Sequence, residues 1–201
     1  MPIRVISPQK ESAGIVLFYK ASSPFSNFHP AEFIVETGGE SKSFNCSEQY
    51  FMYQKALSAG DRESGERILK MTKPLLMKRA GRKLEMDTEM LKKWSSDSLE
   101  VMYKGCLEKF SQNEELRLAL LRTRGMLIAE ASHRDKLWGI GLSVNDKRAE
   151  NSKTWHGSNK LGKILERIRD ELWEKEEFRR DKDLVESEAM ETRYEKLKKL
   201  G

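Results

Sequence analysis

The sequence predicts a mainly helical fold with a small β element, formed as a single compact domain with a C-terminal helical extension. The length of 201 residues suits one domain plus an appendage. Short apolar runs typical of strands occur before residue 47, and apolar residues follow helical spacing after it. We therefore expect an N-terminal extension at residues 1–14, the domain at residues 15–175 and a charged helical tail at residues 176–201.

The β element is expected in the first part of the domain. Residues 15–19 (IVLFY) form a short apolar run, and residues 31–36 (AEFIVE) alternate in polarity, so both indicate strands. Residues 22–30 between them contain two prolines and an asparagine and indicate a loop. Residues 37–43, with two adjacent glycines, are expected to form the turn that leads to Phe44.

Helices are expected through the middle of the chain, where apolar residues recur at 3–4 spacing between prolines and glycines. These helices cover residues 47–58, 61–71, 74–82, 87–110 and 113–122. An extended apolar run at residues 125–131 and a long loop at residues 132–154 follow.

The last core helix begins near Ser158 or Asn159 and shows one strongly apolar face. Beyond about residue 175 the apolar positions thin out between charges. This segment is interpreted as a solvated, weakly packed helical tail, with a helix that binds a partner as the alternative.

Composition and charge limit the function classes. The net charge is +5, and residues 171–201 carry ten acidic against eight basic residues, so the preceding 170 residues hold a balance of +7. That balance suits an anionic ligand such as phosphate, nucleotide or nucleic acid, although an ordinary basic surface explains it equally well. No apolar run reaches the length of a membrane helix, and no secretory signal is recognised, so we expect no membrane partner and a cytoplasmic location, with the nucleus as alternative.

Glu48 is the first candidate for chemistry. Asn45 is placed to cap the helix that follows, which would make Glu48 the third helical residue and a member of a capping box. The same position suits a catalytic carboxylate, because the positive end of a helix keeps it ionised. An ionised carboxylate there can stabilise a sugar cation or take a proton from water.

A second candidate group is Asp135, Trp138 and Gly139 in the loop HRDKLWGIGL. The tryptophan offers a flat stacking surface, and the glycine lets a ligand approach the backbone. Asp135 could bind sugar hydroxyls or polarise a water molecule. The structural alternative is a turn with a buried tryptophan, in which the aspartate serves as a cap.

The remaining candidates suit an anionic ligand. Residues 157–162 (GSNKLG) open a helix whose backbone amides could hold phosphate, although the spacing of a P-loop is absent. Arg82 could contact phosphate through two nitrogens, and Lys55 lies on the same helical face as Glu48. Asn27 could orient a ligand or close an Asx turn, and Trp94 falls on an apolar stripe that by itself indicates core. The three histidines lack metal-ligand spacing, so no metal site is expected.

Together these residues resemble the YbiA-like, or NADAR, family. The resemblance covers about residues 15–172, and each piece is weak alone but specific in this order and spacing. It rests on Phe18-Tyr19, Phe25-Ser26-Asn27-Phe28, Ser47-Glu48-Gln49-Tyr50, Lys55, Gly81-Arg82, Trp94, Lys109-Phe110-Ser111-Gln112-Asn113, Leu116-Arg117, Asp135, Trp138-Gly139, Asn159 and Leu161-Gly162.

The resemblance implies a helix-dominated fold with a small β element and hydrolysis of an N-glycosidic bond with no metal or organic cofactor. By motif position, Glu48 would be the main catalytic carboxylate and Asp135 its candidate assistant. The ligand pocket would be lined by Asn27, Lys55, Arg82, Trp94, Trp138, Gly139 and Asn159. A longer polar insert at residues 142–154 departs from the expected short link and leaves the substrate size in doubt.

The implied partner is a phosphoribosyl or ADP-ribosyl substrate, and the resemblance leaves three functions open. The first is removal of ADP-ribose from guanine in nucleic acid, which the basic core and the polar insert favour. The second is hydrolysis of ribosylamino-pyrimidine phosphates, the early intermediates of riboflavin synthesis. The third is a non-catalytic module that binds ADP-ribose or a nucleotide.

Overall fold

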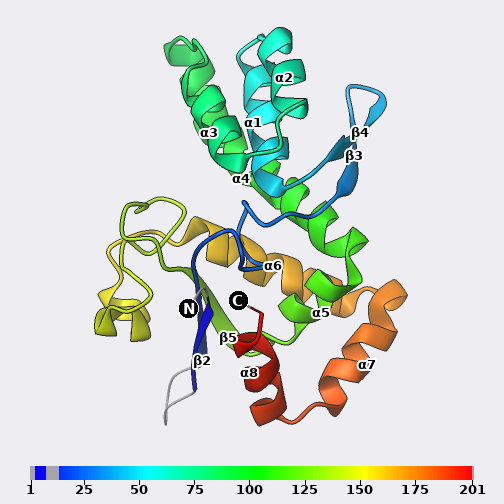
Figure 1. Cartoon of the computed structure of the whole chain (residues 1–201), viewed down its shortest axis with the longest axis vertical. Helices are drawn as coiled ribbons and strands as arrows, with labels where there is room; N and C mark the ends of the chain where they lie inside the picture. The colour runs from blue at the N-terminus through cyan, green and yellow to red at the C-terminus, as the bar shows by residue number, and fades with distance from the viewer. Residues whose placement is uncertain (1–2, 8–13, 201) are drawn as a thin grey trace. The chain divides into compact units, whose positions relative to one another are not determined.

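The computed structural model describes residues 3–7 and 14–200 (Figure 1). Contacts divide the chain into two compact units: residues 1–26 with 114–201, called the sheet unit, and residues 27–113, called the helical unit. Helices dominate and the strands form two small sheets, so the predicted fold class is confirmed. No helix within the described ranges is long and apolar enough to cross a membrane.

The sheet unit is built on three strands in the order β1-β2-β5. The strands are β1 (Ile3–Ile6), β2 (Gly14–Phe18) and β5 (Met126–Glu130). The central strand β2 pairs antiparallel with β1 and parallel with β5. All five residues of β2 are buried, which explains its continuous apolar run. The strand expected at residues 15–19 is confirmed, whereas β1 lies in a segment for which the sequence predicted no strand.

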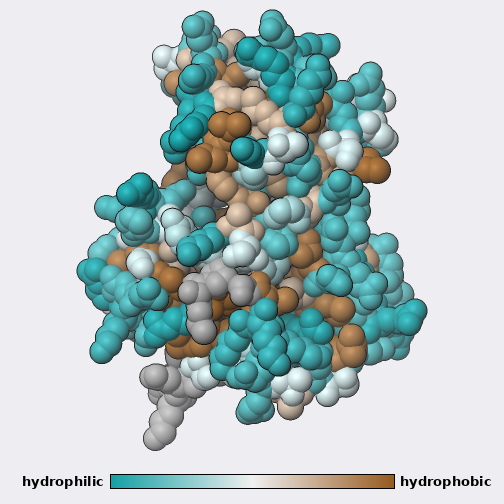
Figure 2. Space-filling view, viewed as in Figure 1, coloured by the Kyte–Doolittle hydropathy of each residue, from teal (hydrophilic) through white to brown (hydrophobic). Residues whose placement is uncertain are grey.

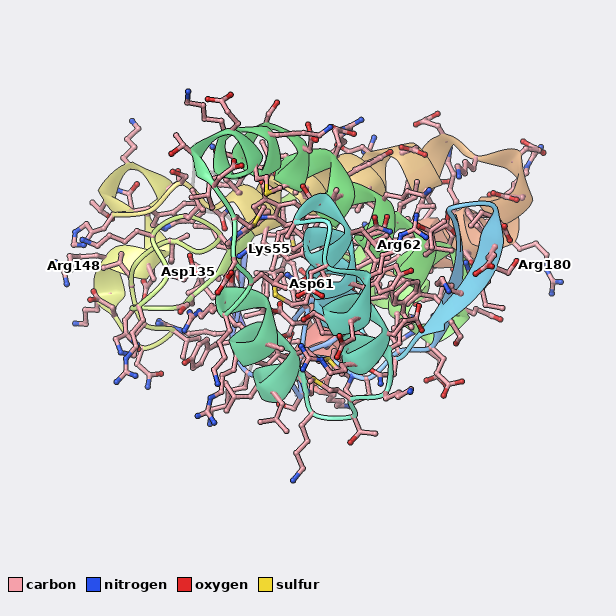
Figure 3. The ribbon with its side chains drawn as sticks, turned by 90° about the horizontal axis from the view of Figure 1, so that it is seen from above. Lys55, Asp61, Arg62, Asp135, Arg148 and Arg180 are labelled. Atoms are coloured by element: carbon pink, nitrogen blue, oxygen red, sulfur yellow. The ribbon has the colours of Figure 1, made fainter. Side chains whose placement is uncertain are left out.

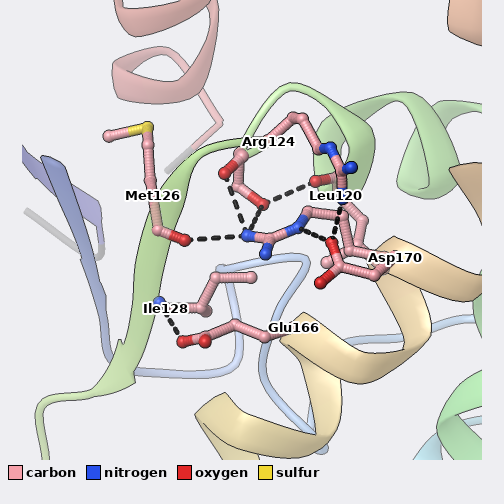
Figure 4. Close-up of polar contacts among 8 residues, drawn as sticks. Leu120, Arg124, Met126, Ile128, Glu166 and Asp170 are labelled. Atoms are coloured by element: carbon pink, nitrogen blue, oxygen red, sulfur yellow. Dashed lines mark hydrogen bonds and ion pairs between the residues drawn. The ribbon is translucent and has the colours of Figure 1, made fainter. Parts of the chain in front are cut away.

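The described part of the sheet unit also contains four α-helices and three short 3₁₀ turns. They are α5 (Glu114–Leu121), η1 (Lys147–Glu150), η2 (Ser152–Thr154), α6 (Lys160–Glu174), η3 (Glu176–Phe178), α7 (Arg179–Ser187) and α8 (Met190–Lys198). Helix α6 packs on β5 through polar contacts (Figure 4). The buried guanidinium of Arg169 donates to the carbonyls of Thr123 and Met126, and the carboxylate of Glu166 accepts the amide N–H of Ile128.

The C-terminal tail is helical, as predicted, but the expectation of weak packing is wrong. Val185 on α7 and Leu197 on α8 are both buried to 0% exposure. Helix α7 packs against α5, and α8 packs against β1. These buried apolar residues of the tail therefore pack against the rest of the sheet unit. The predicted domain boundaries at residues 14 and 175 stay predictions.

The helical unit begins with a β-hairpin of β3 (Phe33–Thr37) and β4 (Glu40–Phe44). The sequence assigned residues 37–43 to a turn, but only Gly38 and Gly39 form it, with φ of 62° and 83°. Two glycines at positive φ make the tight connection whose twist matches paired strands. Pairing with β3 then holds the polar sequence of β4 in a strand that its composition did not predict.

Four helices complete the helical unit: α1 (Ser47–Ser58), α2 (Arg62–Leu69), α3 (Pro74–Arg82) and α4 (Thr88–Gln112). The other three all pack against α1. Each brings a glycine against a large side chain of α1, with Gly65 at Tyr53, Gly81 at Met52 and Gly105 at Tyr50. These glycines let the three helices approach α1 closely, which places α1 at the centre of the unit.

The molecular surface is densely ionic, as expected from 34% charged residues. Figure 2 shows hydrophilic residues over most of the face in view. The large apolar residues that are exposed lie singly or in pairs along the described ranges. They are Ile34, Leu75, Leu76, Leu91, Leu137, Leu184 and Met190.

Candidate functional site

The residues predicted for the site fall into two sets, one in each unit. The helical unit holds Asn27, Glu48, Lys55, Arg82 and Trp94. The sheet unit holds Asp135, Trp138, Gly139 and Asn159. The first set is arranged around α1, and the second around the start of α6.

Glu48 is the second residue of α1, which begins at Ser47 with Cys46 as its N-cap. The prediction that Asn45 caps this helix with Glu48 in third position is wrong, because the N-cap is Cys46 and the third helical residue is Gln49. The Oε1 atom of Gln49 accepts the backbone N–H of Asn45 at 2.8 Å. Glu48 thus lies one residue before the position predicted for it within the helix, and its side chain is only 4% exposed.

Gln49 has a structural role that the sequence analysis did not assign. Its Nε2 lies within 3.1 Å of the carbonyl oxygens of Ile68, Leu69 and Met71, at the end of α2. A helix end leaves carbonyls without partners, and this amide satisfies part of that demand. Gln49 thereby fixes the start of α1, and with it Glu48, against α2. A glutamine at the third helical position is the signal that could have identified it.

Asn27 joins the start of α1 to α4. Its backbone carbonyl accepts the N–H of Glu48 at 3.0 Å, and its side-chain Oδ1 lies 3.6 Å from the Sγ of Cys106. The first contact fixes the backbone of Glu48 directly. Asn27 is therefore held beside Glu48, as a pair of site residues would require.

Buried ionisable groups lie close to this helix start. Lys109 is 1% exposed, and burial lowers its pKa to about 8. Burial also raises the pKa of the Cys46 and Cys106 thiols to about 11, while the charge of Lys109 acts in the opposite direction. Thiols with such pKa values stay protonated near neutral pH, which does not favour a nucleophilic cysteine here. Lys109 appears in the sequence only as one of the residues that carry the family resemblance, because no local spacing distinguishes it.

Lys55 is anchored rather than extended into solvent. Lys55 lies on α1 (Figure 3), and its Nζ donates to the carbonyl oxygen of Gly81 at 2.8 Å, at the end of α3. Burial, and then the charge of Arg82, hold the pKa of Lys55 below its ordinary value. The Arg82 side chain itself is exposed. The two cations thus lie near each other, one half-buried and one open to solvent.

Trp94 packs on α1 from its position in α4. Its ring lies 4.9 Å from that of Phe51, between centroids, at an interplanar angle of 50°. The tryptophan remains partly exposed. It is therefore an edge of the helical core, and part of its surface is open to a ligand.

Asp135 supports the turn in which it lies. Its Oδ1 accepts the backbone N–H groups of Leu137 and Trp138 at 3.0 and 2.8 Å. This geometry is the turn-capping alternative considered for Asp135, and its side chain is partly exposed (Figure 3). Gly139 is required by close packing, because a Cβ atom there would lie 2.7 Å from the carbonyl oxygen of Glu130.

The start of α6 does not offer the backbone amides expected of a phosphate site. The N–H groups of Ser158, Asn159, Lys160 and Leu161 donate to carbonyls of residues 136–139 at 2.8–3.3 Å. The expectation that amides near Asn159 bind phosphate is therefore wrong, because the preceding loop already occupies them. The loop that carries Trp138 acts as the cap of this helix.

Asn159 connects α6 to β5. Its Nδ2 donates to the carbonyl of Ile128 at 2.8 Å, and its Oδ1 accepts the N–H of Glu130 at 3.2 Å. The residue is 2% exposed and takes a left-handed backbone conformation with φ of 49°. Its amide thus holds the strand end and the helix start together.

Across the described ranges, no group of three His, Cys, Asp or Glu side chains is placed to hold a metal ion.

Comparison with known proteins gives the family. A model of the NADAR domain matches residues 17–173. Protein irg-1 of Caenorhabditis elegans is 47% identical over 203 residues, covering 96% of both chains. N-glycosidase R617 of Acanthamoeba polyphaga mimivirus is 35% identical over 148 residues, covering 73% of this chain and 86% of the relative.

A solved structure is also similar. The NMR structure of the Escherichia coli protein YbiA matches with a TM-score of 0.61 at 31% identity, over 79% of this chain and 84% of that one. The curated E. coli relative is named N-glycosidase YbiA. The family model covers most of the chain, and these relatives align over most of their own length. The chain therefore belongs to the NADAR family, among hydrolases that act on N-glycosyl bonds.

Proposed function

We propose that this chain removes ADP-ribose from guanine in nucleic acid by hydrolysing the N-ribosyl bond, with Glu48 as the catalytic carboxylate. The observation that carries the proposal is the position of Glu48. It lies in the first turn of α1 and is only 4% exposed. A carboxylate held almost fully buried in the first turn of a helix lies close to the positive end of that helix, which favours its ionised form.

The proposed reaction is attack of water on the anomeric carbon of the ribose. The bond from that carbon to the base nitrogen breaks, a bond to the water oxygen forms, and the base leaves with a proton. The transition state resembles an oxocarbenium ion, so a nearby carboxylate stabilises its positive charge. Glu48 would orient the water or shield the cation. Asp135 would be the assisting carboxylate, acting through Oδ2, since Oδ1 accepts the N–H groups of the turn.

The other residues have distinct roles in this proposal. Arg82 is exposed and takes a phosphate group, and Lys55 adds positive charge beside it. Trp94 and Trp138 are partly exposed and provide stacking surfaces for the base.

Two asparagines and a glycine act by positioning. Asn27 and Asn159 fix backbone next to Glu48 and at the start of α6, respectively. Gly139 keeps the Trp138 loop close to β5. These three are positioning residues, since their contacts run to the chain itself.

The decisive experiment compares Glu48→Gln with Glu63→Gln, a glutamate in the first turn of the neighbouring helix α2. The wild-type protein is incubated with ADP-ribosylated guanine in an oligonucleotide, and free ADP-ribose is measured. Loss of a catalytic carboxylate should slow release by at least about 100-fold. Glu63→Gln should match wild type, and circular dichroism should show that both variants are folded. Normal turnover by folded Glu48→Gln would remove the assignment.

The same assay separates the two alternative functions. Ribosylamino-pyrimidine phosphate contains the same type of bond, and its preferential hydrolysis would assign the chain to riboflavin intermediates instead. Binding of ADP-ribose without hydrolysis, at protein concentrations above those of the substrate, would identify a binding module. The longer polar insert at residues 142–154 favours the larger, ADP-ribosylated substrate.

A further inference from the structure

A groove of about 1080 Å³ lies on the helical unit, and Arg82 is the one candidate site residue in its lining. It is formed by the start and outer face of α2, by α3 and by the segment after α3. Its charged lining residues are Asp61, Arg67, Arg79, Arg82, Lys83 and Glu85. Cations thus outnumber carboxylates by two to one.

Three of the four cations of this groove form no ion pair within the described part of the chain. Arg79, Arg82 and Lys83 form no ion pair with any other residue in the described ranges, and Arg67 donates to the hydroxyl of Ser64. The Asp61 carboxylate is engaged as the cap of α2, where it accepts the Ser64 N–H at 2.8 Å. A groove whose positive charges are not neutralised by the protein favours a polyanion.

Three of the cations are clustered on α3. Arg79, Arg82 and Lys83 are three and four residues apart on α3 and at its end, so they share one face of the helix. Two of the three are arginines, whose planar guanidinium matches the geometry of phosphate. Together with Arg67 on α2, this cluster spreads positive charge along the groove, which suits the several phosphates of a chain.

We propose that this groove binds the backbone of a single nucleic-acid strand beside the modified nucleotide. The inference rests on the proposed function for its biological meaning, but binding can be measured without hydrolysis. Met71, Leu76 and Leu84 supply apolar surface along the groove for sugars and bases. No aromatic side chain is part of its lining, so the strand is held through phosphates and its sequence is not read.

The groove is connected to Glu48 through α1. Arg82 lines the groove, and the preceding residue, Gly81, accepts the bond from Lys55. Lys55 and Glu48 are seven residues apart on α1, which is roughly 10 Å along the helix axis. A strand in the groove therefore brings its phosphates to within a few nucleotides of the catalytic carboxylate.

The test uses the full chain and a short fluorescent single-stranded oligonucleotide without modification, followed by anisotropy over a range of salt concentrations. The test variant is the double reversal Arg79→Glu/Lys83→Glu, which leaves the proposed catalytic residues intact. The matched control is Lys92→Glu/Lys93→Glu, which changes the charge equally on exposed residues of α4 outside the groove.

The groove variant should bind about tenfold more weakly in moderate salt, and its log–log salt slope should be shallower by about 1.4, because each lost contact accounts for about 0.7 with a single strand. The control should bind like wild type. Equal losses in both double variants would overturn the proposal. So would equally strong competition by an acidic peptide of the same charge, which would assign the groove to a protein partner.

Hydrolysis separates this inference from the proposed function. With ADP-ribosylated guanosine, which has no strand, the groove variant should keep wild-type rates. With the same nucleotide inside an oligonucleotide, its KM should rise while kcat changes little. Failure of wild type to hydrolyse either substrate would remove the proposed function, and the anisotropy result would still decide whether the groove binds nucleic acid.

Discussion

Lys109 shows what a single buried charge contributes to the helical unit. It is 1% exposed and lies close enough to Cys46 and Cys106 to affect both thiols. Transferring an ammonium group from water into the protein interior carries a large free-energy cost, and the lowered pKa expresses that cost. The charge is thus held at the expense of stability, which is typical of groups kept for function.

The pKa of Lys109 predicts a specific pH dependence of stability. In the folded chain it loses its proton near pH 8, against an ordinary value of 10.5 in the unfolded chain. Between these values the unfolded chain binds more protons, so the free energy of unfolding rises with pH. Relative to Lys109→Met, wild type should gain about 3 kcal/mol from pH 8 to 10.5, measured by urea denaturation.

Other buried groups change with pH in the opposite direction, so the comparison of variants is essential. Burial raises the pKa of Tyr50 to about 12 and of the two thiols to about 11, and their contribution falls as pH rises. Tyr50 is present in both proteins and cancels in the difference, whereas the thiols cancel apart from the effect of the Lys109 charge on their pKa. Lys92→Met, at an exposed lysine of α4, should show no such change. A flat difference for Lys109→Met would contradict a buried, partly neutral lysine.

The helices could be predicted from the sequence because their evidence is local. Periodic apolar residues and a proline at the first position fixed the bounds expected for α1 and α3, and both agree with the structure. Strand β4 could not be predicted in this way, because its polar residues are held by pairing with β3. Long-range pairing leaves no signal within the five residues of the strand itself.

The same distinction applies to the candidate site. The position of Glu48 near a helix start was evident, but whether it served as the cap depended on Gln49 and the end of α2. The amides at the start of α6 looked available because a sequence cannot show that residues 136–139 return to accept their bonds. Motifs therefore located the groups, and only tertiary contacts decided which of them are occupied.

The packing around α1 predicts a graded response to alanine at its three glycine contacts. A methyl group on Gly105 would collide with the Tyr50 ring, and one on Gly81 with the flexible end of Met52. On Gly65 it would lie 3.3 Å from the Tyr53 ring, which a small shift relieves. Gly105→Ala should lose about 1–3 kcal/mol. Gly65→Ala should stay within about 1 kcal/mol of wild type, because better helix propensity offsets the strain.

Urea denaturation with an unchanged m-value measures this series. The expected order of loss is Gly105→Ala, then Gly81→Ala, then Gly65→Ala, because a ring held by packing yields less than a methionine end. Equal losses at all three positions would mean that helix propensity, and not the approach of the helices, determines the effect.

At the scale of the whole molecule, the tail belongs to the fold of the sheet unit. Two ion pairs between tail and core have low exposure: Arg117 with Asp181, and Arg122 with Glu188. The first pair joins α5 to α7. The second joins the residue after α5 to the residue after α7. The family model ends at residue 173, yet the packing continues through α8. The chain thus adds helices to the family domain that share its core.

Two leucines of the tail test this view, because they differ mainly in burial. Leu197 on α8 is 0% exposed, whereas Leu184 on α7 is 46% exposed. Leu197→Ala removes buried methyl groups and leaves a cavity, which should lower the free energy of unfolding by about 2–5 kcal/mol. Leu184→Ala should change it by less than about 1 kcal/mol. Thermal denaturation followed by circular dichroism gives both values. If the two variants melted alike, at the wild-type temperature, the tail would be a weakly packed appendage after all, and its removal would leave the sheet unit intact.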